Sequence, residues 1–375
     1  MQLSETIKLY PTKYQKELIT MTMDNYISTV NSLVSDAVRG FSIANITTAN
    51  VKVNLPSALI NQCIRDAKSI LKKYYKNCHK AVLRNRTLIK RNSNIRVTAP
   101  KLSIVKKPCC YINNQNFKIN NNNIEFPVMI NGKSKRISVT TKISDTQKEV
   151  LTNSKLGTMR IVIKNNSIVA QIVYEVVEPL IKEDGNVMGI DLGIKCPAVS
   201  YCSDGSVKFY GNGRKNKYMR RHYEQLRKKI QKTKNIKAIK RINNKEQRIM
   251  KDIDHKISHD IIKTAIAHNV KIIKLEQLSN IRSTTRKSRK NDHSLHNWPF
   301  YRLMKFIEYK AMLVGIKVEF VNPAYTSQKC PICGNIHHAD DRNYICKCGY
   351  HTHRDLLGAI NICNSTEYVG KRHTA

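Results

Sequence analysis

The sequence predicts an α/β multidomain protein, and three features of the 375-residue chain lead to that class. A basic N-terminal part repeats its apolar residues at helical spacing. A middle part alternates apolar with polar residues, and a C-terminal part joins apolar strands, helices and a cysteine cluster. Because the helical and strand periods follow one another along the chain, they favour separate packed domains over a single one.

The N-terminal part predicts a short strand followed by a basic helical module. Residues alternate from Leu3 to Tyr10, and Thr12 with Gln15 three positions later forms a capping-box signal for a helix start. Helical spacing then continues to about Val38 and returns from Pro56 to about Arg91, where lysine and arginine are dense.

The middle part, from Arg96 to Val177, has the period of two that is typical of strands. Asparagine-rich turns interrupt it at Asn120–Asn123 and Asn165–Asn166. The pattern predicts a small antiparallel barrel or a sandwich. The segment EPLIKEDGN then provides a linker, so we expect a domain boundary near residue 185.

The C-terminal part begins with the apolar strand VMGIDLG and continues through hairpin-like strands to about Tyr210. Residues 214–268 predict two long helices separated near Asn243, and the apolar strand KIIKLE follows them. The block from Arg282 to Asn297 has almost no apolar residues. It is either a solvated linker or a lid that touches nucleic acid.

Charge and apolar patterning restrict the class of partner. The chain has 66 Lys and Arg residues against 27 Asp and Glu residues, a formal net charge of +39 spread along its whole length. Such a field attracts polyanions, and nucleic acid in particular. No signal-peptide core and no apolar run long enough to span a bilayer occur, so we expect a cytoplasmic protein with no membrane partner.

Three carboxylates are the candidate catalytic residues. Asp191 follows the apolar run from Val187 to Ile190, Glu276 ends the strand KIIKLE, and Asp355 stands at the start of the helical pattern LLGAINIC. Each acid alone also fits a structural role, such as capping a helix. Together on one face they can hold two Mg²⁺ or Mn²⁺ ions for phosphodiester hydrolysis.

A cysteine cluster predicts a structural zinc site. Cys330 and Cys333 are followed by Cys346 and Cys348, with a glycine after each pair, as in a zinc ribbon. The second pair is C-x-C instead of C-x2-C, which leaves open whether His351 or His353 replaces a cysteine. Motifs for nucleoside-triphosphate, dinucleotide and serine-hydrolase chemistry do not occur, so a metal-dependent nuclease remains.

Four segments resemble the signature blocks of TnpB, the insertion-sequence nucleases ancestral to type V CRISPR effectors. They are GIDLG, LHNWPFYRLMKFIEYKA, NPAYTSQKCPICG and HRDLLGAINI, and the match covers about residues 187–363. The N-terminal IKLYPTKYQ is similar to the opening of the same family, whereas residues 40–180 match mainly by position and pattern.

The resemblance implies a domain plan. Residues 1–12 would form the first strand of a wedge barrel, 13–95 a helical recognition module, 96–184 the remaining barrel, and 185–375 an RNase H-like RuvC nuclease domain with a zinc ribbon at 326–351. It implies that Asp191, Glu276 and Asp355 form the catalytic triad and bind Mg²⁺, and that the four cysteines bind zinc.

The resemblance also implies the partners and the reaction. A monomeric ribonucleoprotein would carry a guide RNA from the transposon end and cut double-stranded target DNA beside a short flanking motif, with base pairing supplying the sequence specificity. Three rivals stay open. One is an unguided RNase H-like recombinase or transposase, another is a guided DNA-binding repressor that does not cut, and the third is a zinc-ribbon nucleic-acid binder without chemistry.

Overall fold

The computed structural model describes residues 1–164, 166–242, 244–278, 300–339 and 341–369. The block from Arg282 to Asn297, for which a linker or a lid was predicted, lies outside the described residues. The chain divides into two compact units, Met1–Val177 and Glu178–Ala375, each described below by itself. Within the described residues, no helix is both long enough and apolar enough to cross a membrane.

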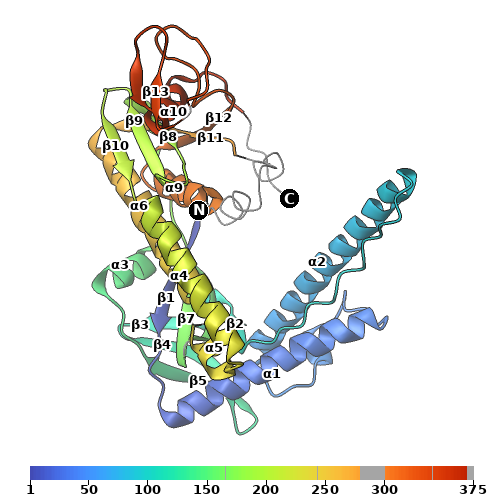
Figure 1. Cartoon of the computed structure of the whole chain (residues 1–375). Coiled ribbons are helices and arrows are strands. Elements are labelled where there is room, and N and C mark those ends of the chain that lie inside the picture. Colours follow the sequence, from blue (N-terminus) through green and yellow to red (C-terminus); the bar gives the residue numbers. More distant parts are fainter. Residues whose placement is uncertain (165, 243, 279–299, 340, 370–375) are drawn as a thin grey trace. The chain divides into compact units, whose positions relative to one another are not determined.

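The N-terminal unit combines two antiparallel sheets with two long helices (Figure 1). One sheet has the order β1-β7-β6-β2 and the other the order β3-β4-β5, and a bridge between Leu9 and Thr141 joins the ends of β1 and β5. The elements of this unit are β1 (Gln2–Lys8), α1 (Lys13–Val38), α2 (Ser57–Lys90), β2 (Cys109–Ile112), β3 (Lys118–Asn120), β4 (Asn123–Ile130), β5 (Lys133–Thr140), α3 (Asp145–Asn153), β6 (Lys155–Lys164) and β7 (Ser167–Glu175), with 3-10 turns at Thr48–Asn50 and Asn114–Asn116.

Local sequence signals explain the start of this unit. The predicted capping box is confirmed: the Gln15 backbone N–H donates to Oγ1 of Thr12, and the Thr12 N–H donates to Oε1 of Gln15. Apolar residues from the helices and from both sheets then meet in one continuous core that includes Tyr26, Leu59 and Ile161.

The C-terminal unit is built around a five-stranded mixed sheet of order β10-β9-β8-β11-β12. The neighbours β10, β9 and β8 pair antiparallel, whereas β8, β11 and β12 pair parallel. The elements of the unit are β8 (Asn186–Asp191), β9 (Ala198–Cys202), β10 (Val207–Tyr210), α4 (Gly213–Lys232), α5 (Ile236–Ile242), α6 (Lys245–Ala267), β11 (Val270–Glu276), α9 (Phe300–Met312), β12 (Lys317–Val321), β13 (Asn343–Ile345), β14 (His351–His353) and α10 (Arg354–Asn364).

One helix prediction in this unit is wrong in detail. Residues 214–268 form three helices instead of two, because the chain also breaks between α4 and α5. Lys234 takes a left-handed backbone conformation there (φ 52°), and the side chain of Asn235 accepts the N–H of Ala238 to begin α5. A polar residue that satisfies an unpaired N–H at a helix start is what allows so short a helix to begin.

Helix α10 packs directly on the central strand β8. A Cβ atom built at Gly189 would lie 2.3 Å from the carbonyl oxygen of Ala359 and from the N of Cys363, so only glycine permits this approach. The buried ammonium of Lys274 on β11 anchors the far end of α10, donating to the carbonyl oxygens of Cys363 (2.9 Å) and Ser365 (2.8 Å). The C-terminal half of the helix is therefore fixed against β8 and β11.

Candidate catalytic site and metal centre

Two of the three predicted acids lie at the same edge of the mixed sheet. In the parallel pairing of β8 with β11, Ile190 lies opposite Leu275. Asp191 and Glu276 each come one residue later, so the strand ends bring the two carboxylates to one edge. The sequence-based expectation that both acids stand at strand ends agrees with this register.

Helix α10 brings the third acid to the same place. A Cβ atom built at Gly358 would lie 3.1 Å from Cγ of Asp191, which shows that this helix face contacts the Asp191 carboxylate. Asp355 lies one turn earlier on the same helix face and is only 8% exposed. The structure thus gathers three acids that are far apart in the sequence around one end of β8.

The electrostatics of the cluster are those of crowded carboxylates. Burial raises the pKa of Asp191 well above its ordinary value, and the negative charges of Glu276 and Asp355 raise it further, while Arg342 and Arg354 oppose the shift. Burial also raises the pKa of Glu276, against the effect of a hydrogen bond from Thr326. Carboxylates that repel one another in a site of this kind are suited to binding cations.

Two residues that contact the acids were not predicted from the sequence. Nη1 of Arg342 donates to Oδ1 of Asp355, and the hydroxyl of Thr326 donates to Oε1 of Glu276. Thr326 precedes the first cysteine pair and Arg342 lies between the two pairs, in irregular segments that no hydrophobic period marks. The signals that could have found them are the segment NPAYTSQKCPICG, which contains Thr326, and the position of Arg342 inside the cysteine motif.

The donor set fits divalent ions with oxygen ligands. Asp191, Glu276 and Asp355 supply only carboxylate oxygens, the ligands that Mg²⁺ and Mn²⁺ prefer. In two-metal sites, carboxylates of this kind hold two ions that stand roughly 3.5–4 Å apart.

This crowding predicts that the acids lower the stability of the metal-free protein. A carboxyl with a raised folded-state pKa costs stability as the pH rises above its ordinary value of 3.8. At neutral pH and without Mg²⁺ or Mn²⁺, Asp191→Asn should therefore raise the free energy of unfolding by about 0.5–2 kcal/mol. Thermal melts of zinc-loaded protein in buffer free of Mg²⁺ and Mn²⁺ test this, and a lower melting temperature for Asp191→Asn than for wild type would contradict it.

The four predicted cysteine ligands converge. Their sulfur atoms all lie within 4.8 Å of one another, with 3.7 Å between Cys330 and Cys348 and 3.4 Å between Cys333 and Cys346. Four sulfurs placed ~2.3 Å from a tetrahedral Zn²⁺ stand about 3.8 Å apart, so the cluster has the size that zinc requires. This four-cysteine arrangement could bind zinc.

The loops of the cluster bring its thiols into contact with backbone N–H groups and with one another. The backbone N–H of Cys348 lowers the pKa of Cys346 to about 6 against the effect of burial, whereas, against the effect of backbone N–H groups, contacts with the thiol of Cys346 raise the pKa values of Cys333 and Cys348. Gly334 and Gly349 take left-handed conformations (φ 73° and 90°) directly after each cysteine pair. Glycine adopts that conformation without strain, which allows each loop to fold back over its sulfurs.

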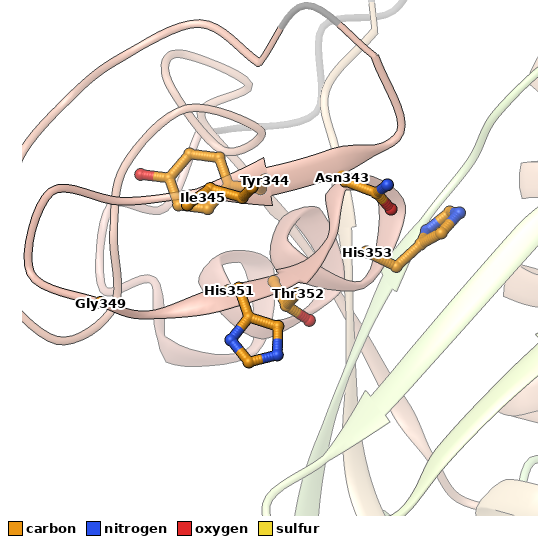
Figure 2. Close-up of a pocket in the computed structure, with 7 residues that line it drawn as sticks. All are labelled: Asn343, Tyr344, Ile345, Gly349, His351, Thr352 and His353. Carbon is orange, nitrogen blue, oxygen red and sulfur yellow. The ribbon is translucent and has the colours of Figure 1, made fainter.

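The positions of His351 and His353 answer whether a histidine replaces a cysteine in the cluster. Nδ1 of His353 accepts the N–H of Asp355 (3.2 Å), and its ring packs edge-on against Phe209. His351 is exposed beside a hollow on the β13–β14 hairpin, where Figure 2 shows it together with Asn343 and His353. The ligand atoms that lie together are the sulfurs of the four cysteines, so both cysteines of the C-x-C pair belong to the candidate zinc site.

The mixed sheet with three acids at one end of its central strand, and the four-cysteine cluster that follows it in the chain, lie in segments that known families share. Two families match the chain: "Probable transposase" (OrfB_IS605) at residues 171–282, and the "Cas12f1-like, TNB domain" at residues 300–362. The first range contains Asp191 and Glu276, and the second contains the cysteine cluster and Asp355.

Comparison with individual proteins agrees with these family matches. The "TnpB-like protein MJ0751" of Methanocaldococcus jannaschii is 34% identical over 261 residues, which are 64% of this chain and 91% of that protein. The chain belongs to the TnpB-like transposase family, which is homologous to the Cas12f effectors.

Two Cas12f1 proteins extend the comparison. The "CRISPR-associated endodeoxyribonuclease Cas12f1" of Sulfoacidibacillus thermotolerans is 31% identical over 197 residues, covering 47% of this chain and 44% of that protein, so the match spans less than half of the longer relative. Cas12f1 in a complex with sgRNA and target DNA shares the fold, with a TM-score of 0.57 at 13% identity over 97% of this chain and 99% of that one.

Proposed function

We propose that this protein is an RNA-guided DNA endonuclease of an insertion sequence, with an RNase H-like RuvC site at Asp191, Glu276 and Asp355. The observation that carries the proposal is the meeting of these three acids at one end of β8, from β8, β11 and α10. Relatives named endodeoxyribonucleases and a neighbour solved with guide RNA and target DNA support the reaction and the partners.

The acidic and basic residues of the proposed site have different roles in phosphodiester cleavage. Asp191, Glu276 and Asp355 would hold two Mg²⁺ or Mn²⁺ ions, which supply an activated water and stabilise the leaving 3′ oxygen when bound. The carboxylates fix where cations can lie relative to the sheet edge. Arg342 and Arg354 add positive charge beside Asp191 and so favour the approach of a phosphate backbone.

The N-terminal unit fits a nucleic-acid partner. We propose that its two sheets, linked by the bridge between Leu9 and Thr141, form most of the wedge barrel expected over residues 1–12 and 96–184, which helices α1 and α2 interrupt over 13–95. The exposed half of α2 carries a run of basic residues from Lys72 to Lys90. We propose that this unit grips the guide RNA and its heteroduplex, in a monomeric ribonucleoprotein that works in the prokaryotic cytoplasm.

Sequencing of the RNA that copurifies with the protein tests the guided reaction. Expressed with its native flanking DNA, the protein should retain one discrete RNA whose variable 3′ segment matches neighbouring DNA. A bulk mixture of cellular RNA would instead favour an unguided recombinase or transposase, the activity that the matched description "Probable transposase" names. A discrete RNA without DNA cleavage would favour a guided repressor.

A further inference from the structure

Thr326 is a buried hydroxyl in contact with one of the proposed metal ligands. It lies in the irregular segment between β12 and the cysteine cluster and is 9% exposed. Its Oγ1 donates to Oε1 of Glu276. The contact joins two residues that are 50 positions apart in the chain.

The segment that carries Thr326 is tied to α10. The side-chain amide of Asn361 donates to the carbonyl oxygens of Thr326 and Lys329, at 2.7 Å each. Tyr325, directly before Thr326, takes a left-handed conformation with φ 59°, which costs a residue with a side chain about 1–2 kcal/mol. Such a conformation persists only where the surrounding contacts hold it, and the two Asn361 bonds are contacts of that kind.

The hydroxyl controls the rotation of the Glu276 carboxylate. The terminal torsion of glutamate is broad and roughly two-fold, so an unrestrained carboxylate samples many orientations. A hydroxyl that donates to Oε1 selects one of them and leaves Oε2 free to bind a cation. Partners of this kind, which orient a metal ligand without touching the metal, change metal affinity or activity by about 10–100-fold when they are removed.

We propose that Thr326, fixed by Asn361, is a positioning residue that orients Glu276 for divalent-metal binding. The proposal rests on the proposed function, because it takes Glu276 as a metal ligand. It links the placement of Glu276 on β11 to α10, the helix that carries Asp355. The two acids are therefore held in one hydrogen-bonded frame, although they belong to different elements.

Thr326→Val removes the hydroxyl and keeps the shape of the side chain. We expect it to weaken Mn²⁺ binding by about 10–100-fold, measured by electron paramagnetic resonance on the protein without DNA, and to slow cleavage at fixed Mg²⁺ by a similar factor. Binding of target DNA should stay unchanged. Thr326→Ser keeps the donor and should restore most of both properties.

Thr22→Val is the matched control, because Thr22 is equally buried and its hydroxyl bonds the carbonyl oxygen of Leu18 in α1. It should leave Mn²⁺ binding and cleavage unchanged. If Thr326→Val does not fold, judged by its melting curve, Thr326→Ala removes the same donor with less bulk. Wild-type Mn²⁺ affinity in the folded variant that lacks the hydroxyl would overturn the proposal.

The Mn²⁺ measurement separates this proposal from the proposed function. If the wild-type protein binds Mn²⁺ but cuts no DNA, the proposed endonuclease activity is rejected. The role of Thr326 is then still tested by the effect of its substitution on Mn²⁺ binding. If the wild-type protein cuts DNA and Thr326→Val keeps full Mn²⁺ affinity, only the proposed role of Thr326 is rejected. A loss of affinity in Thr326→Val that Thr326→Ser does not restore would also reject that role.

Discussion

Replacing Asp191 by alanine should abolish Mg²⁺-dependent DNA cleavage and leave RNA and DNA binding nearly intact. The change removes the carboxylate at the end of β8 that faces Glu276 and Asp355, and with it a ligand of both proposed ions. A loss of about 4 kcal/mol of transition-state stabilisation corresponds to a rate lower by about 10³-fold. Single-turnover cleavage of a labelled target, together with filter binding, measures both properties.

Asp252→Ala is the matched control for this experiment. Asp252 is exposed on α6 and forms an i, i+4 ion pair with Lys256. Its removal should change neither cleavage nor stability measurably, because exposed pairs of this kind contribute little. Cleavage by Asp191→Ala at the wild-type rate would reject the assignment of the site.

Removing zinc should unfold the ribbon and stop cleavage at the same time. The buried core around the cysteine cluster is small and consists of Cys330, Ala339, Tyr344, Cys346 and Leu357. Bound zinc contributes on the order of 10 kcal/mol to the folding of comparable small ribbons. The side chains of Arg342 and Thr326 contact Asp355 and Glu276 from this region. Unfolding of the ribbon should therefore also remove these contacts from two of the three acids.

Chelation and substitution both test the role of zinc. Metal analysis should find one zinc ion per chain, and either a strong chelator or Cys346→Ser should lower the melting temperature and increase hydrogen exchange in α10. Cys78→Ser, which changes a cysteine of α2 outside the cluster, should have neither effect. An unchanged melting curve after verified zinc removal would contradict the structural role.

The site residues that could be placed from the sequence are those that end a predicted strand or belong to a spaced motif. Asp191 and Glu276 follow apolar runs that form buried strands, so their places at strand ends could be inferred. The cysteines were recognised by spacing, and the structure brings all four together. In these cases the local pattern and the final position depend on the same few residues.

What could not be predicted depends on contacts between distant segments. Asp355 was predicted as the third acid, but how it reaches Asp191 was not: Gly189 and Gly358 let α10 lie close to β8, and no periodicity encodes that approach. Thr326 and Arg342 lie in irregular chain, where side-chain direction follows from tertiary packing. The break before α5 was missed because a single left-handed residue, Lys234, interrupts an otherwise helical pattern.

A change of guide RNA tests the central claim most directly. The purified ribonucleoprotein is assembled with its own RNA, in which the variable 3′ segment is replaced by a new sequence, and is given plasmids that carry either the old or the new target beside the same flanking motif. The account predicts Mg²⁺-dependent cutting of the plasmid that matches the new guide and of no other. Cutting that ignores the guide, or no cutting by a folded, zinc-loaded protein that retains its RNA, would contradict it.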